Sequence, residues 1–135
     1  MLLIVPITYE RDDQRRLITV TVTEPYSVDD ILGVIDRQAG EDTWGYAMLY
    51  DLQGITEAWT EADLQRMAYR VKVVGGGRER GPVGMSIPAR PALFLVFLTY
   101  TKLTTELMTV EVLLNSAQRD AWLARNARGG SSRQP

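Results

Sequence analysis

The chain contains no cysteine and no histidine among its 135 residues. Without cysteine it can form no disulfide and has no thiolate nucleophile, and without either residue type it has no Cys/His zinc site and no imidazole acid or base. We therefore predict no metal site, no cofactor and no enzymatic activity. An enzyme would have to use Asp51 with Glu57 or Glu61 as its acid and base, since these carboxylates flank one loop.

A long apolar run and a strong charge of one sign are also missing. The longest uninterrupted apolar run, residues 92–98, is far shorter than the roughly 20 residues that span a bilayer. Residues 1–6 lack the basic segment and cleavage site of a signal peptide and suit a first strand better. The net charge of −2 argues against bulk attraction to nucleic acid. We expect a cytoplasmic protein with no membrane span and no nucleic-acid partner.

The length and composition fit one globular domain. With 45% hydrophobic and 24% charged residues, the 135-residue chain has enough apolar side chains for a single core. The last residues are small and polar and have no apolar periodicity. We therefore predict one domain over residues 1–126 and a disordered tail over residues 127–135.

The order of apolar patterns predicts an α/β fold. Two helix starts carry capping boxes, because Ser27 is followed by Asp30 and Thr60 by Asp63. A hairpin is expected first, since residues 17–23 alternate strictly between apolar side chains and threonine. The predicted order is ββαβαβαβα, with about five strands in a mixed, mostly parallel sheet and about four helices. The expected strands are residues 2–9, 17–23, 46–50, 82–87 and 108–114, and the expected helices follow Ser27, Thr60, Arg90 and either Asn115 or Ser116.

One segment has two interpretations. Residues 92–98 are apolar enough for either a buried strand or a helix that begins at Pro91. We favour the helix, because parallel strands at residues 82–87 and 108–114 need a crossover of this length between them. A helix that is apolar on all sides is either buried in the core or covered by a partner. The alternative to a core position is an apolar groove or homodimer face formed by Phe94, Phe97 and Leu98.

The central predicted strand, residues 46–50, leads into the segment that we expect to carry the function. Open α/β sheets bind their ligands at the carboxyl ends of the strands. Asp51 is either a functional carboxylate or, as we favour, a turn residue that bonds the following amides while Gly54 adopts a positive φ. Trp59 is either a contact residue or a hydrophobic staple. The candidate interaction loop comprises Asp51, Gln53, Gly54, Thr56, Glu57, Trp59 and Thr60.

Two further patterns have ordinary structural interpretations. Gly75–Gly77 follows a predicted helix and lacks the Gly-Lys-Ser/Thr ending of a phosphate loop, so we interpret it as a helix stop and a loop. A concentration of basic residues could bind an anionic headgroup or nucleotide, but a solvated face is the favoured interpretation. It comprises Arg66, Arg70, Lys72, Arg78, Arg80 and Arg90.

Several short sequence segments, taken in order along the chain, resemble those of a known family. Residues 46–54 form a strand that closes on Asp-x-x-Gly, residues 60–64 open the next helix, and residues 80–85 enter the next strand. Residues 110–113 are then followed by a helix over residues 117–123. Over about residues 1–126 the chain is similar to the STAS superfamily, and more closely to its SpoIIAA-like branch, also grouped with STAS/SEC14-like domains. The resemblance implies a small stand-alone α/β domain that binds or regulates a partner.

The resemblance also points to a difference in the expected switch. Family members that act as anti-sigma-factor antagonists carry Asp-Ser-Ser-Gly-Leu, with a phosphorylated second serine, where this chain has residues 51–55. Gln53 occupies the phosphoacceptor position and has no hydroxyl. We therefore expect a non-enzymatic binding module that acts through this loop without the serine phosphoswitch. Thr56 and Thr60 are the nearby hydroxyls, and Thr60 is already explained as a cap.

The sequence does not identify the partner. A protein partner that binds the loop is the first hypothesis. The alternative is a carrier or sensor of an apolar or anionic small molecule, such as a lipid or a nucleotide, and the SEC14-like association makes a lipid conceivable.

Overall fold

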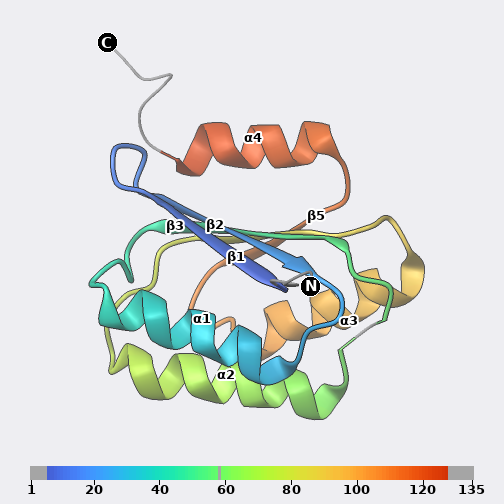
Figure 1. The fold of residues 1–135 in the computed structure, drawn as a ribbon, viewed down its shortest axis with the longest axis horizontal. Helices are drawn as coiled ribbons and strands as arrows, with labels where there is room; N and C mark the ends of the chain where they lie inside the picture. The colour runs from blue at the N-terminus through green and yellow to red at the C-terminus, as the bar shows by residue number, and fades with distance from the viewer. Residues whose placement is uncertain (1–5, 58, 128–135) are drawn as a thin grey trace, which may run out of the picture.

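A computed structural model describes residues 6–57 and 59–127, and its elements confirm the α/β class (Figure 1). The described residues form a five-stranded sheet and four helices. In chain order the elements are β1 (Ile7–Asp12), β2 (Leu17–Thr23), α1 (Val28–Gly40), β3 (Ala47–Gly54), α2 (Glu61–Gly75), β4 (Val83–Ser86), α3 (Pro91–Leu103), β5 (Val110–Leu113) and α4 (Ser116–Asn126).

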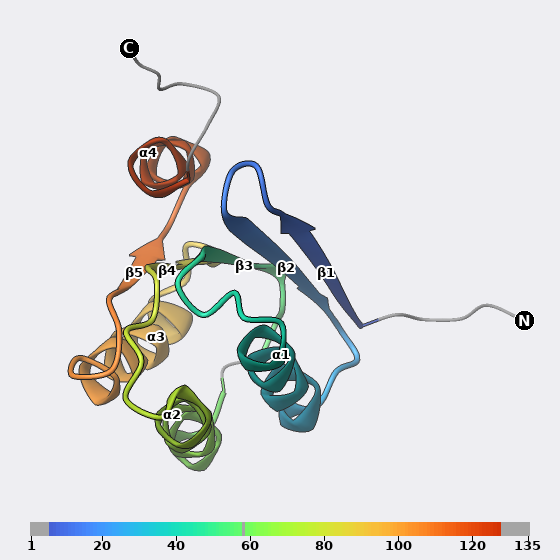
Figure 2. The same ribbon diagram turned by 90° about the vertical axis from the view of Figure 1, so that its left-hand side faces the viewer.

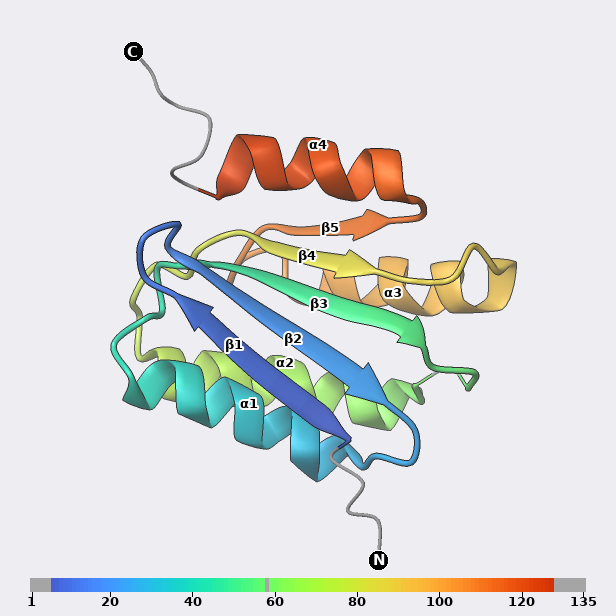
Figure 3. The ribbon, with the colours of Figure 1, turned by 45° about the horizontal axis from the view of Figure 1, so that its top comes forward.

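The sheet is mixed and mostly parallel. Its strands lie in the order β1-β2-β3-β4-β5 (Figure 3). The strand β1 pairs antiparallel with β2, whereas β2, β3, β4 and β5 pair in parallel. Parallel neighbours end at the same edge of a sheet, so the segments that follow these four strands all start from one edge.

The helices cover the two faces of the sheet unequally. Figure 2 shows α1, α2 and α3 on one face and α4 alone on the other. Successive residues of a strand point to opposite faces, so Ile18 and Val20 of β2 enter the larger core and Leu17 enters the smaller one under α4. Trp122 is the buried anchor of α4. The strand β3 contributes to both cores, which explains its nearly continuous apolar sequence.

The predicted helix boundaries agree closely with the structure. Ser27 and Thr60 each accept a hydrogen bond from the amide of the aspartate three residues later, and each capping box is complete. Residues 91–103 form a helix with Pro91 in the first turn. Asn115 caps α4, and Gly76 ends α2 in the left-handed conformation at φ 58°.

Two strands extend beyond their predicted ends, whereas β4 and β5 are shorter than the predicted ranges 82–87 and 108–114. The strand β3 does not end at Tyr50, because the backbone pairs of Thr21 with Asp51 and of Thr23 with Gly54 extend its ladder with β2. The strand β1 runs to Asp12 because its ladder with β2 continues to Leu17. Residues 1–5 and 128–135, which include most of the predicted tail, lie outside the described residues. Within the described part, no helix is long and apolar enough to cross a membrane.

We predict that the contact between β4 and α4 tolerates no side chain at Gly84. A Cβ built there lies 2.9 Å from the ring of Trp122 and 3.1 Å from Leu113. Overpacking of a filled core typically costs about 1–3 kcal/mol, so Gly84→Ala should lower the free energy of unfolding by about that amount. Urea unfolding followed by circular dichroism measures the change.

Gly33→Ala is the matched control for this substitution. Gly33 is exposed in the middle of α1, and a Cβ there meets no atom within 4 Å. Alanine should stabilise the helix by about 0.5–1 kcal/mol. If both substitutions stabilise the protein, the packing of Trp122 on Gly84 does not exclude a side chain at residue 84.

Candidate functional site

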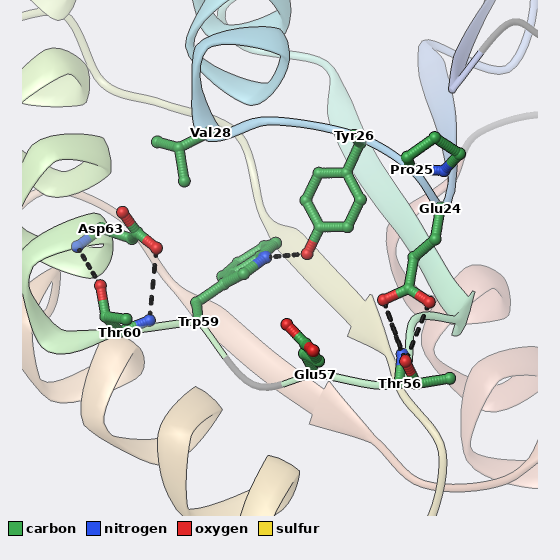
Figure 4. Close-up of a pocket in the computed structure, with 9 residues that line it drawn as sticks. All are labelled: Glu24, Pro25, Tyr26, Val28, Thr56, Glu57, Trp59, Thr60 and Asp63. Carbon is green, nitrogen blue, oxygen red and sulfur yellow. Dashed lines mark hydrogen bonds between the residues drawn. The ribbon is translucent and has the colours of Figure 1, made fainter.

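The candidate site is a groove between the first turns of α1 and α2, at the carboxyl ends of β2 and β3 (Figure 4). It has a volume of about 490 Å³ and combines two chain segments that each connect a strand to a helix. Its lining residues are Glu24, Pro25, Tyr26, Val28, Thr56, Glu57, Trp59, Thr60 and Asp63.

A carboxylate joins the two segments at one end of the groove. Glu24 accepts hydrogen bonds from the backbone amide of Thr56 at 3.1 Å and from the Thr56 hydroxyl at 2.9 Å. These bonds lower the pKa of the Glu24 carboxyl below its ordinary value. On the other side of Thr56, Arg90 donates to its carbonyl oxygen at 2.9 Å. The loop after β3 is therefore held to the β2–α1 junction and to the start of α3.

An aromatic pair forms the floor of the groove. The indole Nε1 of Trp59 donates a hydrogen bond to the hydroxyl of Tyr26. The Trp59 ring packs edge-on against Phe97 of α3, with ring centroids 4.7 Å apart. Only 5% of Trp59 is exposed, whereas Tyr26 is half-buried, and burial raises the pKa of the Tyr26 phenol. Trp59 thus supports the groove from below, and Tyr26 presents the more accessible aromatic surface.

The charge in the groove is negative. Glu24, Glu57 and Asp63 line it, and its lining includes no lysine or arginine. Figure 4 shows the Glu57 carboxylate between Trp59 and Thr56, and no described side chain forms an ion pair or hydrogen bond with it. A cationic group would therefore be attracted to the groove, and an anionic one would be repelled.

The two helix N-termini do not reverse this sign. The first turn of a helix attracts anions through its free amides and its dipole. In α1 and α2 the third helical residue is an aspartate that closes a capping box, so each helix supplies its own anion. The described carboxylates include no group of three that could hold a metal ion.

The structure separates the predicted interaction loop into two parts. Thr56, Glu57, Trp59 and Thr60 line the groove. The other three predicted residues, Asp51, Gln53 and Gly54, are not in the loop, because they belong to β3. The ladder with β2 continues through them, which the apolar pattern does not reveal.

The side chain of Asp51, two residues after Leu49 of the smaller core, lies on the α4 face of the sheet. Asp51 accepts a hydrogen bond from the Gln53 amide at 3.1 Å, which agrees with the local bonding favoured from the sequence. Gln53 in turn donates to the Ser86 hydroxyl and the Ile87 carbonyl, each at 3.0 Å. The positive φ predicted for Gly54 is wrong, because only Gly76 and Gly77 have one among the described glycines.

The residues predicted as an apolar groove or dimer face are also divided. Phe97 is fully buried against Trp59 and cannot contribute to an exposed face in this structure. Phe94 and Leu98 are half-buried. The exposed apolar side chains of α3 are instead Leu95, at 63%, and Leu103, at 43%.

Sequence reasoning missed half of the groove. Glu24, Pro25, Tyr26 and Val28 come from the junction of β2 and α1, and Asp63 comes from the first turn of α2. The sequence does contain a signal for these residues, because residues 24–28 also follow a strand that ends at the carboxyl edge of the sheet. The alternating pattern of residues 17–23 indicates a hairpin strand, however, and does not show that this strand also pairs in parallel with β3.

Comparison with known proteins finds no relative. No protein-family model, no curated protein and no solved structure matches the chain. The resemblance to the SpoIIAA-like branch therefore stays a prediction.

We predict that the Glu24–Thr56 link makes stability depend on pH. A carboxyl whose pKa is lowered by folding stabilises the folded state above its unfolded pKa, and this stabilisation is lost as the pH falls. For Glu24 the loss should develop below its ordinary value of 4.5. Glu24→Gln should therefore lower the thermal midpoint at pH 7 and have a smaller effect near pH 3, as measured by calorimetry.

The matched control is Glu10→Gln. Glu10 is exposed on β1, and its side chain makes no hydrogen bond among the described residues. Glu10→Gln should change the thermal midpoint little at either pH. Equal effects of Glu24→Gln at both pH values would show that the hydrogen bonds from Thr56 do not favour the charged carboxylate.

Proposed function

We propose that the protein is a non-enzymatic binding module that takes a basic side chain of a protein partner into the groove between α1 and α2. The observation that carries the proposal is a groove at the carboxyl edge of the parallel strands with three lining carboxylates and no lining cation. The location matches the place where open α/β sheets bind ligands. A lysine or arginine side chain has the complementary charge, and its aliphatic stem suits the surface of Tyr26.

The separation of the carboxylates supports a binding role over a catalytic one. The only acid/base pair that the sequence offers needs Asp51 beside Glu57 or Glu61. Asp51 lies on the α4 face of the sheet and bonds the Gln53 amide, whereas Glu57 lines the groove. Asp51 is not among the residues that line the groove, and this separation favours a binding role for Glu57.

The carboxylates of the groove also weigh against the alternative function at this position, which is the binding of an apolar or anionic small molecule. An anionic lipid headgroup or nucleotide would meet three carboxylates, and the two helix N-termini are already capped by aspartate. An apolar ligand would find a mixed lining, because Glu24, Glu57 and Asp63 lie beside Pro25, Tyr26 and Val28, and the indole of Trp59 is almost fully buried.

Short peptides with one central arginine or lysine test the proposal. In ¹⁵N-labelled protein, a basic peptide should shift the amide signals of Thr56, Glu57 and Thr60, and a peptide with citrulline or norleucine at that place should not. Binding should weaken with added salt, because the contact is electrostatic and partly exposed. Shifts confined to other surfaces would contradict the assignment of the groove.

Charge reversal in the groove provides the quantitative test. Glu57→Lys should weaken peptide binding at least tenfold, and Glu10→Lys, which makes the same charge change on exposed β1, should weaken it about twofold or less. A thermal midpoint for each variant shows that both remain folded. Equal affinity of the wild type and Glu57→Lys would overturn the proposal.

A further inference from the structure

A second feature lies at the opposite edge of the sheet, where a guanidinium is buried. Arg80 lies in the segment between α2 and β4, and only 6% of it is exposed. Sequence reasoning placed it on a solvated basic face, and for this residue that interpretation is wrong. Packing from distant segments buries it, since Gln38 of α1, Met48 of β3 and Met108 before β5 all contact its guanidinium.

The hydrogen bonds of this guanidinium are few and weak. Nη2 donates to Oε1 of Gln38 at 2.9 Å, and the other two acceptors are thioether sulfurs, Met108 at 3.0 Å from Nη1 and Met48 at 3.5 Å from Nη2. A thioether is a weak acceptor. The Nε atom is buried and has no hydrogen-bond partner among the described residues.

The positive charge also lacks a negative partner in the described part of the chain. Each ion pair found there involves another arginine. The buried phenols of Tyr50 and Tyr100 do not replace a carboxylate, because burial raises the pKa of both above its ordinary value, although the charge of Arg80 and, for Tyr50, a hydrogen bond with Arg80 act in the opposite direction. An arginine stays charged at any accessible pH, and a buried charge is normally paired.

A pocket brings solvent close to this group. It has a volume of about 380 Å³ and lies between residues 77–80 and 105–109. Met108 both lines the pocket and accepts the hydrogen bond from Nη1 of Arg80. A methionine side chain is unbranched and flexible, so a change of its rotamer would connect the guanidinium to the pocket.

We propose that Arg80 binds a small planar anion of the carboxylate type, which enters from this pocket past Met108. A guanidinium presents its donors as a planar fork that matches two oxygens of a carboxylate or nitrate. The unpartnered Nε supplies one donor of that fork, and Nη2 supplies the other when the anion replaces its weak 3.5 Å contact with the Met48 sulfur. The Trp44 ring lies 4.7 Å from the guanidinium carbon and covers it. This site is independent of the acidic groove and holds the opposite charge.

Two carboxylates near the entrance do not prevent this binding. Glu79 and Glu106 line the pocket and would repel an anion at its mouth. Both are exposed, so water and salt screen them. The guanidinium is buried, and an anion in direct contact with it interacts in a medium of lower dielectric constant. The contact with Arg80 therefore outweighs the repulsion at the entrance.

The side-chain Nε–H signal of Arg80 in ¹⁵N-labelled protein gives the direct test. Sodium formate and sodium nitrate are the probes, and sodium chloride, whose spherical anion does not match the planar fork, holds the ionic strength constant. The signal is identified by its loss in Arg80→Met. We expect it to shift saturably with either probe, and the thermal midpoint of the wild type to rise with probe concentration, as ligand binding requires.

Three variants make the result decisive. Arg80→Met should abolish the probe-dependent rise of the midpoint, and Arg66→Met, which removes an exposed arginine of α2, should keep it. Met108→Ala should tighten formate binding several-fold, because it opens the entrance to the guanidinium. If Arg80→Met does not fold, Arg80→Lys identifies the signal instead, because lysine keeps the charge and has no guanidinium Nε–H, and the titrations of the wild type and Met108→Ala then decide.

The proposal is overturned by a shift of the Arg80 signal that stays linear in probe concentration, or by an equal midpoint rise in the wild type and Arg80→Met. Either result would assign Arg80 a structural role only. An affinity unchanged in Met108→Ala would overturn the entry route. None of these measurements uses the acidic groove, so the proposed function stands or fails separately.

Discussion

The parallel pairing of four strands is the constraint on which the rest of the structure depends. Because β2, β3, β4 and β5 run in one direction, each must be followed by a segment that starts from the same edge. The helices α1 and α2 therefore begin side by side, and the segments that precede them form the two walls of the groove. The groove is a product of topology first and of particular side chains second.

The same topology gives each edge its own electrostatic character. At the carboxyl edge, capping by Asp30 and Asp63 neutralises the two helix N-termini, so the lining carboxylates determine the sign of the charge. Toward the other end of α2, Arg78 donates to the carbonyls of Val74 and Gly75, where the helix dipole is negative. Exposed ion pairs such as Arg70–Asp36 join α2 to α1 and contribute little stability each.

Most of the fold could be predicted because its signals are local. The capping boxes at Ser27 and Thr60 depend on residues three apart, and the alternation in residues 17–23 specifies which face of β2 is buried. The end of β3 was missed because backbone pairing with β2 continues beneath polar side chains, and polarity carries no information about that pairing. The segment 91–103 was assigned correctly from topology, since its own composition fits both states.

The candidate sites were less predictable because they combine distant segments. Glu24 and Thr56 are 32 residues apart, and their contact follows only from the pairing of β2 with β3. The burial of Arg80 is harder still to predict, because Arg80 follows a glycine-rich loop, where a charged residue is normally solvated. Its burial depends on Gln38, 42 residues away, and on Met108, 28 residues away. No local pattern contains those contacts.

The position of Arg80 explains why a buried cation is compatible with an acidic groove in so small a domain. Arg80, Trp44 and Met108 precede β4, β3 and β5 respectively, so they gather at the amino edge of the parallel strands. The groove lies at the carboxyl edge, about one strand length away at roughly 3.3 Å per residue. Glu24 and Glu57 of the groove are exposed, so water and salt screen their interaction with Arg80 at that separation, although Arg80 itself is buried. Each site can therefore keep a ligand preference of opposite sign, and substitutions at one edge should act independently of those at the other.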